Sequence, residues 1–265
     1  MLPSAAIHRA SPSRRHLQVL ALAAAAAALG AGEQASAATV GIHFRYQYGA
    51  TVGANINTAG NEIFGGIPAA NWNNMAPIDL GGDTPLLQIG QALTTTGATG
   101  ISLDYSAQNA YGPYGAPTDA NAAYFSYLDD TVGASYSGYT VTIHGLSSFL
   151  GAGETYSIKA LQSTDELDAS FGNVFIYQGT GTSGPLLATL SNTGIFFFPA
   201  DAGVYGDTND SPQLTADTIT IVGEPRVGAR RSTLAGLAIQ SVPEPSTLLL
   251  LLGGCALQLR RRRRA

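Results

Sequence analysis

The stretch Tyr139-Thr140-Val141-Thr142-Ile143-His144 alternates apolar and polar side chains, and this period of two predicts a half-buried β-strand. The same alternation recurs along the chain between segments of Gly, Asn, Asp, Ser and Thr, which favour turns. Many short strands joined by turns indicate a mainly β protein, an antiparallel sandwich of jelly-roll-like topology. The further strands predicted in this way are 40–46, 101–105, 156–161, 173–177, 185–190, 195–198, 218–222 and 234–240.

One segment departs from the alternation. Residues 121–130 place Tyr124, Tyr127 and Leu128 at helical spacing, and Asp119 precedes them as a candidate N-cap. We therefore expect one short helix within the otherwise β body.

The N-terminal segment 1–38 has the three parts of a secretory signal peptide in the expected order. Three arginines precede an apolar run at 19–29, and Ala35-Ser36-Ala37-Ala38 supplies the small residues that a signal peptidase cleaves after. Ser13-Arg14-Arg15-His16-Leu17 also resembles a twin-arginine signal, so Sec and Tat export both stay open.

The C-terminal segment 242–265 also has three parts. Pro243, Glu244 and Pro245 hold the chain extended, and an apolar stretch and a cluster of arginines follow. The apolar stretch is short for a full membrane span, which needs about 20 residues, so we expect a transient membrane-anchor helix with its arginines on the cytoplasmic side. The anchor residues are Leu248, Leu249, Leu250, Leu251, Leu252, Arg260, Arg261, Arg262, Arg263 and Arg264.

This C-terminal arrangement resembles the PEP-CTERM sorting signal of Gram-negative bacteria. The resemblance implies processing by an exosortase after transient anchoring in the inner membrane. It also implies delivery to the cell surface or extracellular matrix, beside exopolysaccharide. Through residues 40–44, 67–74, 127–129 and 231–240, the body is similar to a group of PEP-CTERM proteins, which implies a galactose-binding-like sandwich of a kind that often binds glycans.

The sequence therefore predicts a signal peptide at 1–38, a β-sandwich domain at 39–241 and a sorting signal at 242–265. Residues 39–242 retain five basic and 16 acidic side chains, a net charge of -11. Such an acidic domain is not expected to bind nucleic acid. The single cysteine, Cys255, lies in the tail, which excludes an intramolecular disulfide framework.

Two groups of residues are candidate binding sites. Trp72, Asn73 and Asn74 could bind a glycan, with the ring stacking on a sugar and the amides bonding to hydroxyls, or Trp72 could fill the core while the asparagines shape a turn. Asp201, Asp207, Asn209 and Asp210 offer oxygen ligands suited to Ca²⁺, or are ordinary turn residues. A second acidic group at 165–168 is expected in a solvated loop.

The sequence has no Gly-x-Ser-x-Gly elbow, His-Glu-x-x-His motif or Walker loop, and the two histidines of the body, His43 and His144, lie in predicted strands. We therefore expect a non-enzymatic protein of the cell envelope or matrix with a structural or adhesive role. The alternative is a carbohydrate-binding module, calcium-assisted, and a secreted glycan-active enzyme is the third hypothesis.

Overall fold

The computed structural model describes residues 37–242 apart from 49–50, 54, 80–85, 95–98, 108, 113–117, 130–137, 152, 166–169, 198–202 and 229. These residues belong to a compact unit, Ala37–Pro243. The predicted signal peptide, the Pro243-Glu244-Pro245 motif and the anchor residues lie outside the described residues. Within the described residues, no helix is long and apolar enough to cross a bilayer.

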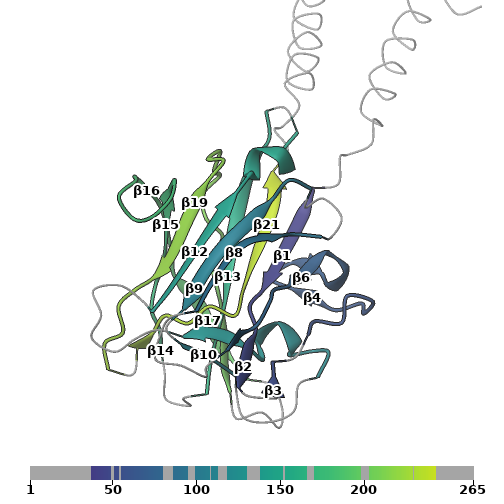
Figure 1. Ribbon diagram of the computed structural model, residues 1–265, viewed down its shortest axis with the longest axis vertical. Coiled ribbons are helices and arrows are strands. Elements are labelled where there is room, and N and C mark those ends of the chain that lie inside the picture. The colour runs from purple at the N-terminus through teal and green to yellow at the C-terminus, as the bar shows by residue number, and fades with distance from the viewer. Residues whose placement is uncertain are drawn as a thin grey trace, which may run out of the picture. The chain divides into compact units, whose positions relative to one another are not determined.

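Two six-stranded sheets make up the body (Figure 1). The first sheet has the order β17 (Asn192–Phe196), β18 (Val204–Thr208), β13 (Thr155–Thr164), β21 (Gly236–Val242), β1 (Thr39–His43) and β6 (Trp72–Asn74). The second has the order β16 (Leu186–Leu190), β15 (Val174–Gln178), β19 (Ile219–Gly223), β12 (Tyr139–His144), β9 (Ser102–Ala107) and β8 (Leu86–Ala92). Neighbouring strands are antiparallel except β1 and β6, which run parallel.

Short elements connect and flank the sheets. The small strands are β2 (Tyr46–Tyr48), β3 (Thr51–Val52), β4 (Ile63–Phe64), β5 (Ile67–Pro68), β7 (Ile78–Asp79), β10 (Asn109–Tyr111), β11 (Tyr127–Asp129), β14 (Ser170–Phe171) and β20 (Arg230–Arg231). The 3-10 turns are η1 (Ala69–Asn71), η2 (Ala122–Tyr124) and η3 (Leu146–Phe149).

The main core lies between the two sheets. Alternate residues of the central strands point into it, for example Val40 and Ile42 from β1 and Val141 and Ile143 from β12, all fully buried. The core cluster draws such residues from both sheets, as the period-two pattern requires. The prediction of a mainly β, antiparallel sandwich is therefore confirmed, and its jelly-roll-like topology stays a prediction.

A second apolar cluster covers the opposite face of the first sheet. Its centre is Trp72, whose ring lies against Gly41 and Gly236, the residues of β1 and β21 that turn away from the main core. Phe64 meets the Trp72 ring edge-on, with 6.0 Å between the ring centroids. The lack of a side chain at the two glycines is what allows an indole ring to approach the sheet so closely.

The predicted helix at 121–130 is wrong. The chain makes the single 3-10 turn η2 and then extends as β11. All residues from 121 to 129 are buried, and Leu128 exchanges backbone hydrogen bonds with Leu234. A helix would keep its backbone hydrogen bonds to itself and lose this pairing, so tertiary contacts override the helical spacing of the aromatic residues.

The pairing of β1 with β21 brings the two ends of the body together. Thr39 is opposite Gln240, and the backbone N–H of Ala38 donates to Ser241 Oγ at 2.8 Å. We call this the near end of the sandwich. At the opposite, far end, β1 finishes at His43 and β21 begins at Gly236.

A methyl group at Gly41 should destabilise the fold, because it would overlap the ring of Trp72. We expect Gly41→Ala to lower the free energy of unfolding by about 1–3 kcal/mol, the usual cost of overpacking, as measured by urea denaturation. Gly194→Ala is the matched control, since its new methyl group would meet nothing within 4 Å. Equal stability of the two variants would contradict the tight packing of Trp72 on β1.

Candidate functional site

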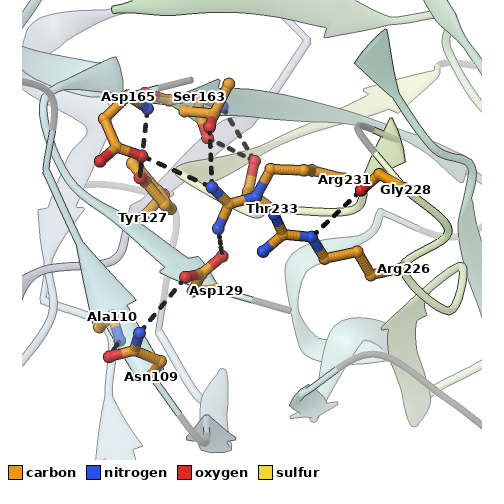
Figure 2. Close-up of polar contacts among 11 residues, drawn as sticks. Asn109, Ala110, Tyr127, Asp129, Ser163, Asp165, Arg226, Gly228, Arg231 and Thr233 are labelled. Atoms are coloured by element: carbon orange, nitrogen blue, oxygen red, sulfur yellow. Dashed lines mark hydrogen bonds and ion pairs between the residues drawn. The ribbon is translucent and has the colours of Figure 1, made fainter. Parts of the chain in front are cut away.

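A buried ionic cluster lies at the far end of the sandwich, centred on Arg231 of β20 (Figure 2). Its side chain is 4% exposed and that of Asp129, from β11, is 8% exposed. Nη2 of Arg231 donates to Oδ1 of Asp129, while Nη1 lies 3.5 Å from Oδ1 of Asp165 and 3.2 Å from Oγ1 of Thr164. The guanidinium thus joins β11, β20 and the end of β13.

Tyr127 completes the cluster. Its hydroxyl donates to Oδ1 of Asp165 at 2.8 Å and accepts the backbone N–H of Asp165 at 3.3 Å. Burial, together with the charges of Asp129 and Asp165, raises the pKa of Tyr127 well above its ordinary value, so the hydroxyl stays protonated and able to donate. Asn109 of β10 donates to Oδ2 of Asp129 at 3.4 Å.

This arrangement is suited to cross-linking the fold. Two carboxylates share one guanidinium and accept further bonds from a phenol and an amide, so each charged group of the cluster is paired and hydrogen-bonded. Asp165, expected in a solvated loop, lies in this cluster instead. The sequence did carry a weak sign of it, because Arg231 is one of only five basic residues in the body.

The predicted glycan-binding residues are used inside the fold. Trp72 is 1% exposed, and its Nε1 donates to the backbone oxygen of Ile67 at 3.3 Å. The structure therefore places this ring in the core, with no face turned to solvent. Asn73 is buried; it donates to the backbone oxygen of Gly41 at 2.9 Å and accepts the backbone N–H of Thr94 at 2.7 Å.

Asn74 links the second apolar cluster to His43. Its amide exchanges two hydrogen bonds with the backbone of Ile56, and its Oδ1 lies 3.1 Å from Nδ1 of His43. His43 is fully buried, and within the part of the chain that the structure describes its Nε2 meets no hydrogen-bonding partner. Burial lowers the pKa of His43 to about 4, with a smaller contribution from the charge of Arg45, so the ring is neutral at pH 7.

The predicted calcium ligands have separate roles. Asp201 lies outside the described residues. Asp207 accepts a hydrogen bond from the Tyr124 hydroxyl at 2.8 Å, and burial raises the pKa of its carboxyl group. Asn209 accepts the backbone N–H of Ser191, while Asp210 lies 3.8 Å from the amine of Lys159. In the described segments, no group of three or more His, Cys, Asp or Glu side chains could hold a metal ion. Calcium binding stays a prediction.

A pair formed by a histidine and an aspartate lies on the outer face of the second sheet. Nε2 of His144 is 3.1 Å from Oδ2 of Asp104 on the neighbouring strand β9, and both side chains are about one-third exposed. The backbone N–H of Gly90 is the largest cause of the lowered pKa of Asp104, and His144 adds to it. The sequence pattern placed His144 in a strand but did not reveal this partner.

Comparison of the whole chain with protein-family models, curated proteins and solved structures gives no match. The described residues form a mainly β sandwich, and the polar cluster at its far end is buried and internally paired.

Removing the guanidinium of Arg231 should be costly, because it leaves the buried carboxylate of Asp129 and the partly buried carboxylate of Asp165 without a counter-charge. We expect Arg231→Met to lower the free energy of unfolding by about 3–5 kcal/mol in chemical denaturation. Its neighbour Arg230 provides the control, since it is half-exposed and pairs with Glu224 at 3.0 Å. Arg230→Met should cost about 1 kcal/mol or less. A small effect of Arg231→Met would show that the cluster contributes little to stability.

The neutral state of His43 predicts acid sensitivity. Its pKa rises from about 4 in the folded protein to about 6.5 on unfolding, so the unfolded chain binds the proton first as the pH falls. Stability should decline by about 3 kcal/mol between pH 6.5 and pH 4 because of this residue alone. The unfolding free energy of His43→Gln, measured across this range, should fall less steeply than that of the wild type. His144→Gln is the control, and an unchanged slope for His43→Gln would contradict the assignment.

Proposed function

We propose that this protein is an exported β-sandwich that an exosortase system sorts to the cell surface or extracellular matrix, where it has a structural or adhesive role. The observation that carries the proposal is the arrangement of the body around its two ends. The compact unit Ala37–Pro243 excludes nearly all of both predicted sorting segments. A body of this kind can keep its two sheets when the segments at 1–36 and 244–265 are removed.

The pairing of β1 with β21 adds a directional argument. Because Thr39 and Gln240 are neighbours at the near end, the predicted signal peptide and the predicted anchor both join the body there. The near end is therefore the part of the body from which the predicted anchor continues. The far end and the long edges of the sheets would then be the parts free to contact other molecules.

The internal use of the polar candidates supports a structural or adhesive role over catalysis. Arg231 pairs with both Asp129 and Asp165, and the amides of Asn73 and Asn74 bond to the backbone of the body. Such contacts stabilise a fold that must persist outside the cell, in a chain that has no disulfide.

Deletion of Pro243-Glu244-Pro245 tests this proposal in the native host. We expect the wild-type protein to reach the surface or matrix fraction as a shortened form, with both terminal segments missing by intact-mass measurement. The deletion variant should stay in the inner-membrane fraction with its tail attached. Substitution of Ser246 and Thr247 by alanine is the control, and it should leave sorting unchanged. A wild-type protein that keeps its tail in the inner membrane would overturn the proposal.

A further inference from the structure

Strand β17 forms an apolar edge of the first sheet. Phe196 points to the second apolar cluster, where its ring lies 5.2 Å from that of Tyr124 and stacks on Tyr205 at 6.1 Å. Its neighbours Ile195 and Phe197 turn the other way and are 46% and 61% exposed. Large apolar side chains on an edge strand favour pairing with a further strand.

The other edge strands differ in the features that could hinder pairing with a further strand. On β8, the register with β9 shifts between Gln88 and Gln91, and Asp104 binds the backbone N–H of Gly90 within this bulge. Strand β16 also pairs with a bulge, and on β6 the side chain of Asn73 is buried. Strand β17 has its own irregularity at its start, but its register is regular from Gly194 to Phe196. Bulges hinder edge-to-edge pairing, so the regular stretch Gly194–Phe196 is the part of β17 that can take a further strand.

Charge points to a second copy of the same chain as the partner. Residues 169–200, which include β15, β16 and β17, carry no charged side chain. The rest of the body is strongly acidic, since the net charge of residues 39–242 is -11. Two copies therefore repel each other over most of their surfaces and can approach most closely along this uncharged edge.

We propose that β17 pairs antiparallel with β17 of a second copy about a two-fold axis, so that the first sheets of both copies become one continuous sheet. A self-complementary patch of this kind gives a closed dimer rather than a filament. The exposed Ile195 and Phe197 side chains of the two copies would cover each other across the axis.

The antiparallel arrangement has a consequence for adhesion, and this step rests on the proposed function. Strand β17 lies beside β18, which pairs with Leu161–Thr164, the half of β13 nearer the far end. Reversal of strand direction at β17 therefore places the near ends of the two copies at opposite ends of the dimer. Two copies whose near ends are held at different cell surfaces would bridge those cells.

Cysteine cross-linking of the full chain in its host tests this pairing. Cysteines are introduced one at a time at Thr193, Ile195 and Phe197, and at Leu87 and Ile89 of β8 as controls of similar or greater exposure. The wild type, with Cys255 as its single cysteine, gives the background. We expect disulfide-linked dimers from at least one β17 position and none above background from β8. Absence of dimers from β17, or equal dimers from both edges, would overturn the pairing.

Two populations of cells carrying differently tagged Ile195→Cys chains test the bridge: once released protein is washed away, mixed-tag dimers in the cell fraction report contacts between cells. The charge introduced by Ile195→Lys should weaken cell clumping by about tenfold, whereas Ile89→Lys should leave clumping unchanged. Protease digestion of intact cells reports the location independently of dimerisation. Protein at the surface without mixed-tag dimers would overturn the bridge and leave the proposed function intact. Protein absent from the surface would overturn both.

Discussion

The body depends on one strand above all others. Strand β21 lies between β13 and β1, and its residues pair with both neighbours: Ile239, for example, faces Ile158 on one side and Val40 on the other. Because β21 is the last strand of the body, the first sheet cannot close until the chain is complete to Val242. The contact between Thr39 and Gln240 spans nearly the whole body, and such long-range pairing costs the most loop-closure entropy.

At the far end of the sandwich, an ion pair links segments that have little regular strand pairing. Among the described residues, the chain there forms the three-stranded sheet β3–β2–β7 and the two-stranded pairs β10–β11 and β14–β20, and two-stranded pairs are marginally stable by themselves. Arg231 comes from β20 and Asp129 from β11, so their ion pair links these two strands. The bond from Arg231 to Thr164 connects them to the end of β13. Removing the two charges from water costs free energy. The buried ion pair nevertheless accepts few alternative partners and so fixes how these segments meet.

Period-two patterns were informative where strands face the main core. Val141 and Ile143 alternate with threonines because one face of β12 is buried, and the strand was found from sequence with its bounds correct. Strand β18, Val204–Thr208, was missed because Tyr205 packs in the second apolar cluster while Val204 is also buried, so its sequence does not alternate. The segment 121–129 misled for a related reason: it is buried on all sides, and helical spacing carries little information there.

The buried polar contacts could not be derived from local sequence. Arg231 meets Asp129 and Asp165 across 102 and 66 residues, so their encounter is set by sheet topology rather than by spacing. The sequence did leave two interpretations for Trp72, and the glycines decide between them. Gly41 and Gly236 lie on the same face of neighbouring strands, and without side chains they leave room for the ring of the chain's single tryptophan. The residues next to Trp72 in the sequence suggest a glycan-binding loop. The glycines on distant strands, which have no Cβ, allow the ring to be buried instead.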